Sequence, residues 1–359
     1  MPGKVLDRLQ RLRAGLAEKE IESMLVSQPE NRFYLSGFSG SAGYLLVTPD
    51  RAVLATDFRY IEQAKAQAPD YEIFRAAGDI AGWLPEMARD LGIRALGFEA
   101  ANVTFSLYQQ LKDGIKEKDT GNRLVPLNGV VESLRVVKEP EEIAFMEQAA
   151  RIADGAFEYA ESFIQPGMTE REAAWEIEKA MRERGSQALP FDIIVASGPN
   201  AAMPHAQPSA RRIGLGEPVV IDMGARHEGY ACDLTRTICL GNQDDTFKRV
   251  YDVVLGAQLT AIAIVKDGMT GEQADSLARK VIEQAGYGEA FGHGTGHGVG
   301  LATHEPPRLA PKSADVLKKG MVFTIEPGVY LPGWGGVRIE DLVQMEEGRV
   351  RVLSGARKA

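Results

Sequence analysis

The second part of this 359-residue chain contains an internal repeat, which constrains the fold more than any other feature of the sequence. Residues 166–174 (PGMTEREAA) and 267–275 (DGMTGEQAD) share a threonine followed three residues later by Glu or Gln. This spacing is typical of a capping box, which begins a helix, and a glycine stands where each predicted helix ends. The residues concerned are Thr169, Glu172 and Gly185 in the first copy and Thr270, Gln273 and Gly286 in the second.

The match continues downstream of both predicted helices. Each copy has a histidine near proline, then an apolar strand that ends in an acid, then a second strand with another acid. The pairs are His205 with His304, Asp222 with Glu326, and Asp233 with Glu340. Chance similarity is the alternative, because capping boxes are common, but four matched features in one order argue against it. The repeat therefore predicts two related α/β halves that face each other across a pseudo-two-fold axis, with a site between them.

The four paired acids predict a metal site. Four carboxylates at the ends of apolar strands could not share a dry pocket without cations, because like charges and desolvation would force protonation. Two divalent ions would balance their charge, and bridging carboxylates are typical of two-metal centres.

The glycine-rich segment 292–300 (GHGTGHGVG) supplies the histidines of this site. It lacks the Lys-Ser/Thr of a phosphate-binding loop, so we expect its glycines to let the backbone pass close to metal and substrate. His297 is the better ligand candidate, and His293 is expected to line the pocket. A set of one imidazole and four carboxylates favours Mn²⁺, Co²⁺ or Fe²⁺ over a structural zinc site, although Zn²⁺ competes. The predicted metal ligands are Asp222, Asp233, His297, Glu326 and Glu340.

Composition excludes several classes of function. The formal net charge is −9 and no basic run stands out, which argues against nucleic-acid or membrane-surface partners. The charged N-terminal segment is unlike a signal peptide. The longest apolar stretch, residues 253–265, is too short to span a bilayer and predicts a buried helix. Cys232 and Cys239 are expected to be buried free thiols, so we predict a reducing, cytoplasmic location.

The first 130 residues alternate short strands and helices, the pattern of an α/β layer. Pro49-Asp50 predicts a hairpin turn, and the Glu139-Pro140-Glu141-Glu142 quartet predicts a helix start. We place a first domain at residues 1–130 and a second at 135–359. His227 falls in the turn after Asp222 and is expected to be a solvated surface residue.

Several motifs occur in order across residues 135–355. They are VVIDMGA, ACDLTRT, GTGHGVG, HEPP, TIEPGVY and VRIEDLV. With these motifs the chain resembles the M24 group of creatinase, aminopeptidase P, prolidase and methionine aminopeptidase, the "pita-bread" metallopeptidases. GFSGSAG at 37–43 and TDFRY at 56–60 resemble the N-terminal domain of its proline-specific members. The resemblance implies a creatinase-like N-terminal α/β domain followed by a pita-bread α+β domain with an internal repeat.

The resemblance also implies roles for the predicted site residues. Asp222 would bind one metal ion in bidentate fashion, and His297 and Glu326 would bind the other. Asp233 and Glu340 would bridge the two ions. His205 and His304 resemble the histidines that contact the scissile carbonyl and the proline nitrogen, and His293 resembles a histidine at the start of the substrate. Arg338 would orient the acids of its strand, so that the expected catalytic residues are His205, His304, Glu326 and Arg338.

The implied reaction is metal-assisted hydrolysis of the Xaa-Pro bond in short proline-containing peptides. His205 or His304 would stabilise the oxyanion, and Glu326 would carry a proton to the leaving nitrogen. The N-terminal motifs favour an Xaa-Pro aminopeptidase, and a prolidase that splits only Xaa-Pro dipeptides is the close alternative. A metal-free peptide-binding scaffold and a creatinase-type amidinohydrolase are disfavoured by the intact ligand set. The resemblance further implies a homodimer.

Overall fold

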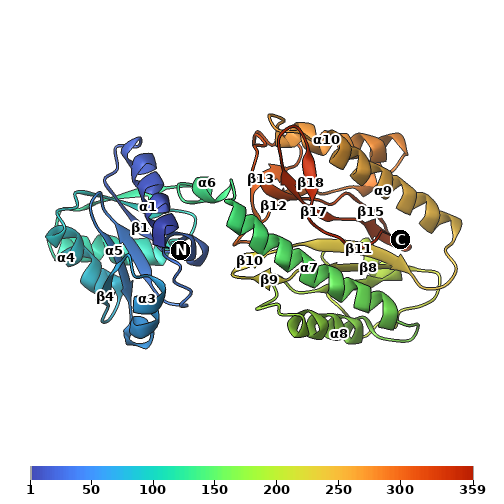
Figure 1. Cartoon of the computed structure of the whole chain (residues 1–359), viewed down its shortest axis with the longest axis horizontal. Helices are drawn as coiled ribbons and strands as arrows, with labels where there is room; N and C mark the ends of the chain where they lie inside the picture. Colours follow the sequence, from blue (N-terminus) through green and yellow to red (C-terminus); the bar gives the residue numbers. More distant parts are fainter. Residues whose placement is uncertain (1, 359) are drawn as a thin grey trace. The chain divides into compact units, whose positions relative to one another are not determined.

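The elements expected from sequence spacing are present in both parts of the chain (Figure 1). The computed structural model describes residues 2–358. The chain divides into unit 1, Met1–Arg135, and unit 2, Val136–Ala359. Within residues 2–358, no helix has both the length and the apolar character needed to cross a bilayer.

Unit 1 is built around a six-stranded sheet with the order β4-β3-β2-β1-β5-β6. Its strands are β1 (Ser23–Val26), β2 (Tyr44–Val47), β3 (Ala52–Thr56), β4 (Glu72–Arg75), β5 (Ala95–Glu99) and β6 (Arg123–Leu127). The strand β2 pairs antiparallel with β1 and β3, and the other neighbours are parallel. The predicted turn at Pro49-Asp50 joins β2 to β3, so the mixed α/β layer is confirmed.

Helices cover this sheet. They are α1 (Pro2–Ala17), α2 (Pro29–Ser36), α3 (Ile61–Gln67), α4 (Ile80–Asp90), α5 (Phe105–Glu117) and α6 (Glu132–Arg135), with the 3₁₀ turn η1 (Phe58–Tyr60). The apolar residues Leu9, Leu12 and Leu16, at helical spacing on α1, are each no more than 1% exposed. Such a stripe is what buries one face of an amphipathic helix.

Unit 2 consists of the two copies of the repeat. The first contains α7 (Pro140–Phe163), α8 (Glu170–Glu183), β7 (Ile194–Ser197), η2 (Gly198–Ala202), β8 (Pro218–Met223), β9 (Arg226–His227), β10 (Tyr230–Ala231) and β11 (Leu234–Cys239). The second contains α9 (Asp245–Ile264), α10 (Gly271–Gln284), η3 (Gly288–Ala290), β12 (Gly296–Gly298), β13 (Glu305–Leu309), β14 (Val322–Ile325), β15 (Gly328–Leu331), β16 (Gly335–Arg338), β17 (Asp341–Met345) and β18 (Val350–Val352). Figure 1 shows α9 and α10 on one side of the strands and α8 on the other.

The two copies form the same local hydrogen bonds. Thr169 Oγ1 and Thr270 Oγ1 each accept a bond from the backbone N–H three residues on, at 3.2 Å. Further matched bonds run from Gly167 N to Ile213 O and from Gly268 N to Leu317 O, each at 2.9 Å. Gly185 and Gly286, which end the two helices, have φ of 100° and 87°, a conformation that favours glycine. The predicted repeat is therefore confirmed.

The pairing register of the acid-bearing strands differs between the copies. The strand β8 pairs antiparallel with β11, and Asp222 lies opposite Thr235. In the second copy, Ile325 lies opposite Asp341 and Gly328 opposite Arg338. That register places Glu326 opposite Glu340. The acids are thus diagonal neighbours in the first copy and direct partners in the second, and in both they end on the same face.

Three expectations from the sequence need comment. The apolar segment 253–265 forms the second half of α9, but this helix is buried on one face only: Val254, Ala257 and Ala261 are buried, whereas Leu259 and Ile264 are 47% and 48% exposed. The thiols of Cys232 and Cys239 are free, but only Cys232 is buried. His227 is not a solvated turn residue: it lies on β9, half-buried, with its ring centroid 6.1 Å from that of Phe145. The aromatic partner comes from α7, far away in the sequence, which a local turn pattern could not indicate.

Candidate metal centre

A cavity of about 830 Å³ opens beside the acid-bearing strands of unit 2. Every residue predicted for the site lines it: His205, Asp222, Asp233, His293, His297, His304, Glu326, Arg338 and Glu340. The two copies of the repeat therefore bring their matched histidines and acids into one pocket.

The centre of the site combines residues of both copies. Among the described residues, Asp233, His297 and Glu340 each offer a ligand atom, and these atoms all lie within 4.8 Å of one another. Nε2 of His297 lies 3.3 Å from Oε1 of Glu326 and 3.7 Å from Oδ2 of Asp233. This grouping has the ligand types and the closeness that one divalent cation needs.

The backbone fixes the tautomer of His297. Its Nδ1 lies 3.1 Å from the carbonyl oxygen of Gly298, which can only accept a hydrogen bond. The proton of the neutral ring therefore resides on Nδ1, and Nε2 presents a lone pair to the carboxylates. Because two acceptors facing each other repel, a cation between them fits the arrangement, and an oriented histidine of this kind is usual in metal sites.

Two buried carboxylate oxygens support the same interpretation. Within residues 2–358, Asp222 Oδ1 and Glu340 Oε1 are buried without a hydrogen-bond partner. The other oxygens of these two groups are engaged: Asp222 Oδ2 accepts from Arg338 at 2.7 Å, and Glu340 Oε2 accepts from Thr235 at 2.6 Å. Each carboxylate is thus held by one oxygen and presents the other, as a metal ligand must.

Electrostatics without metal are unfavourable for the ionised acids. Burial, together with the charges of neighbouring carboxylates, raises the pKa of Asp233 and of Glu340 well above the usual range. Burial also raises the pKa of Glu326. Bound cations reverse this effect because they favour the ionised form. The residues present therefore fit a divalent metal centre.

Two histidines lie at the exposed rim of the pocket. His304 has its ring centroid 4.1 Å from that of His297, and burial lowers its pKa. His205 approaches from the other copy and is also exposed. Within residues 2–358 their ring nitrogens have no hydrogen-bond partner, so both histidines can contact a substrate.

His293 differs from them. Its Nδ1 lies 2.8 Å from Gly294 O and its Nε2 lies 2.9 Å from Tyr330 Oη. The same hydroxyl accepts a bond from Arg338 at 2.9 Å, so its own proton points to His293. Both ring nitrogens are therefore occupied, and His293 can present only its ring to a substrate.

Sequence reasoning missed several residues around the ligands. Tyr330, Thr235 and Thr324 each bond a ligand or its neighbour from inside the unit. Thr324 stands in the otherwise apolar strand β14, and a polar residue at such a position is a signal that could have been used. Arg308 also lines the cavity, with an exposed side chain. Nothing in its local sequence distinguishes it from a surface arginine.

An oxygen-rich metal pocket between two related α/β halves defines a metal-dependent enzyme with the pita-bread fold. The chain belongs to metallopeptidase family M24, whose sequence profile matches residues 144–347. The profile of the creatinase/prolidase N-terminal domain matches residues 8–137. The protein is therefore a metallopeptidase of the branch that contains prolidases and aminopeptidase P, and the predicted family is confirmed.

Similar proteins of known name extend over the whole chain. An Xaa-Pro dipeptidase from Bacillus anthracis has a structure with a TM-score of 0.95 and 43% identity, over 99% of both chains. An Xaa-Pro dipeptidase of Pyrococcus furiosus is 38% identical over 97% of both chains. The structure of an X-Pro aminopeptidase from Thermotoga maritima gives a TM-score of 0.88 with 36% identity, over 96% of this chain and 99% of that one.

Proposed function

We propose that this metallopeptidase is an Xaa-Pro dipeptidase that uses two divalent metal ions, held by Asp222, Asp233, His297, Glu326 and Glu340. The sequence motifs alone favoured an aminopeptidase, with the dipeptidase as alternative. The similar proteins named above include both activities, and the dipeptidases among them support the alternative better.

Arg308 is the observation that carries the choice of a dipeptidase. Arg308 and His304, which stands four residues before it in the sequence, both line the cavity. A dipeptide has a free carboxylate on its proline, directly beside the scissile bond, whereas a longer peptide has a neutral amide there. Arginine binds carboxylates with paired, charge-assisted hydrogen bonds, so a cation in this pocket favours the shorter substrate.

The chemistry follows from the arrangement of the donors. When bound, the metal ions supply Lewis-acid polarisation of the carbonyl and a water acidic enough to attack it near neutral pH. His304 and His205 reach the substrate from the rim, and one of them donates to the oxyanion. Glu326, whose Oε1 faces His297, carries the proton to the leaving proline nitrogen. Arg338 holds Asp222 in place through its 2.7 Å bond.

The ligand set also restricts which metal ion the site favours. Four carboxylates and one imidazole favour Mn²⁺ or Co²⁺, and Zn²⁺ or Fe²⁺ can compete for the same donors. The homodimer and the cytoplasmic location stay predictions from the sequence.

The test compares three substrates: an Xaa-Pro dipeptide, its C-terminal amide and an Xaa-Pro tripeptide. We expect the wild-type protein, reconstituted with Mn²⁺ or Co²⁺, to prefer the dipeptide. Replacing Arg308→Met should raise KM for the dipeptide by ~10–100-fold, the value of a charge-assisted bond, and leave the amide unaffected. Lys312→Met, four residues further along the chain and outside the cavity lining, serves as the matched control. Equal hydrolysis of all three substrates, with no effect of Arg308→Met, would favour the aminopeptidase instead.

A further inference from the structure

A short segment beyond the last strand of unit 2 is fastened to the interior by buried charges. Residues 354–358, which we name the strap, follow β18. The carboxylate of Asp154 on α7 accepts bonds from Gly355 N at 2.7 Å and Ala356 N at 2.9 Å. Ser354 Oγ accepts a bond from Leu342 N at 2.8 Å. The strap is therefore held by two different elements of the unit.

Arg236 connects the strap to the metal centre. Its side chain is fully buried, with 1% of the residue exposed. It donates to Ala356 O at 2.7 Å and to Arg357 O at 3.1 Å. The same guanidinium donates to the carbonyl oxygen of Glu340. One buried cation thus holds both the strap and the backbone of a predicted bridging ligand.

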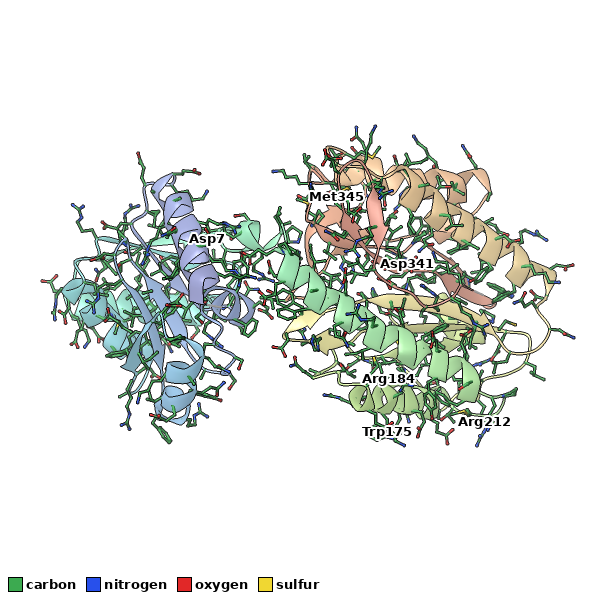
Figure 2. All side chains as sticks on the ribbon, viewed as in Figure 1. Asp7, Trp175, Arg184, Arg212, Asp341 and Met345 are labelled. Carbon is green, nitrogen blue, oxygen red and sulfur yellow. The ribbon has the colours of Figure 1, made fainter. Side chains whose placement is uncertain are left out.

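Asp341 completes the connection. Figure 2 shows it in the interior of unit 2, among the strands. It is 1% exposed and forms an ion pair with Arg236 at 2.7 Å. Its second oxygen accepts from Gln258 at 2.8 Å and pairs with Lys358 of the strap at 2.7 Å. The residue directly follows Glu340 in the sequence.

The Arg236–Asp341 pair joins the two ligand-bearing strands. Arg236 lies on β11, three residues after Asp233, and Asp341 begins β17, one residue after Glu340. A buried ion pair keeps its geometry only while its remaining donors and acceptors are satisfied. The strap provides several of these partners: the carbonyls of Ala356 and Arg357 and the ammonium group of Lys358.

We propose that the strap and the Arg236–Asp341 pair form a positioning device for the two bridging carboxylates, Asp233 and Glu340. When the strap is detached, Arg236 and Asp341 lose partners that they need in the interior, and the backbone at Glu340 shifts. The residues of the device do not touch the substrate and act only through the ligands. The proposal rests on the ligand assignment of the proposed function.

The repeat shows that this device is not part of the common framework. Aligned at the ends of their long helices, the two copies place Leu255 where the first copy has Asp154, and Phe157 where the second has Gln258. In each pair one copy has an apolar side chain and the other has a polar one. Asp154 accepts hydrogen bonds from the strap, and Gln258 donates one to Asp341. The polar residues are therefore an addition to the repeat, which a purely structural role in the helices would not require.

The experiment detaches the strap at a distance from the metal. Asp154→Leu removes both oxygens that accept hydrogen bonds from the strap, and it introduces the residue found at the matching position of the second copy. Asp154→Asn keeps one of the two acceptor oxygens. Lys358→Met removes the positive charge next to Asp341. Asp267→Asn is the matched control, because Asp267 also accepts a backbone N–H, from Gly348 at 2.9 Å, in the same unit but away from the ligands. The probe is Co²⁺ alone, measured by calorimetric titration and by its visible absorption spectrum, with thermal unfolding of the metal-free protein.

We expect Asp154→Leu and Lys358→Met to weaken Co²⁺ binding by ~10–100-fold, as loss of groups that support ligands usually does, and to change the cobalt spectrum. The Co²⁺ affinity of Asp154→Asn should lie between that of these two variants and that of the wild type. In all three variants kcat should fall by a larger factor than KM rises. Asp267→Asn should leave both the affinity and the spectrum unchanged. A wild-type spectrum and affinity in folded Asp154→Leu, or in Lys358→Met where Asp154→Leu does not fold, would overturn the proposal. If the wild-type protein itself binds no Co²⁺, the ligand assignment of the proposed function fails first, so the two failures are distinguishable.

Discussion

The two copies of the repeat in unit 2 share a framework but differ where they meet the metal centre. Both begin a 14-residue helix with a threonine capping box, and both pin that helix to a later segment with the same hydrogen bonds. Their acids, however, differ in length and register: Asp222 and Asp233 are staggered, whereas Glu326 and Glu340 face each other. Only the second copy provides a histidine ligand candidate, His297.

This difference shows which parts of a repeat are free to change. The framework bonds satisfy backbone groups that cannot stay unpaired in either copy, so they persist together. The proposed two-metal site needs two unequal contributions, because its two positions would have different ligands. A register difference of two residues keeps every side chain on its original face, and a longer glutamate can then reach the same pocket from another position.

The strongest test of the comparison replaces the two acids that are proposed to bridge the metal ions, one from each copy. If Asp233 and Glu340 play equal parts, Asp233→Asn and Glu340→Gln should each reduce kcat/KM by ~1,000-fold or more, since metal ions supply several kcal/mol of transition-state stabilisation. Metal content per chain, measured by mass spectrometry after reconstitution, should fall in both variants. Folding should be largely retained, because replacing a charged acid by its amide relieves repulsion among the carboxylates.

An unequal result would break the comparison. Full activity and metal content in one variant would show that its copy contributes no bridging ligand. Asp315→Asn provides a control for charge, because Asp315 lines the same cavity but accepts a backbone bond from Arg308 and is not one of the proposed metal ligands.

A smaller effect is expected from the two threonines that support the ligands. Thr235 Oγ1 donates to Glu340 and accepts from Arg338 at 3.2 Å, so it connects the two copies. Thr324 Oγ1 donates to Glu326 at 3.0 Å and accepts from His297 N at 3.0 Å, within the second copy alone. Substitution by valine keeps the shape and removes the hydroxyl, which costs ~10–100-fold in metal affinity at such positions.

The distribution of that loss sharpens the comparison. In a calorimetric titration with Mn²⁺, Thr235→Val should weaken every resolved binding event, because a bridging acid and Arg338 are both affected. Thr324→Val should weaken only the event that involves His297 and Glu326. Identical isotherms for the two variants would contradict a division of the support between the copies.

Sequence alone predicted the repeat, both capping boxes and every ligand candidate, because these depend on residues at short or fixed spacing. It could not predict that His227 packs against Phe145, or that Tyr330 occupies a nitrogen of His293, because those contacts join distant segments. The sequence also could not predict the difference in strand register between the two copies. The spacing between Asp222 and Asp233 predicts a hairpin but not which residues face each other. Arg236 and Asp341 stand in the ACDLTRT and VRIEDLV motifs beside the predicted ligands, and only the structure shows that they pair.

The smallest effect concerns Asp154, which has no polar counterpart in the second copy. Burial raises its pKa, although bonds from Gly355 and Ala356 lower it in part. A carboxyl whose pKa is higher in the folded than in the unfolded protein stabilises the fold below the unfolded pKa, and this contribution is lost as pH rises through the folded pKa.

Asp154→Asn has no such titration. Above about pH 4, the unfolded value, the free energy of unfolding of the metal-free wild type, relative to Asp154→Asn, should therefore fall as pH rises. Calorimetry of both proteins at several pH values measures this difference. A difference that stays constant with pH would mean that Asp154 is solvated like an ordinary surface acid, and that the strap does not seal it.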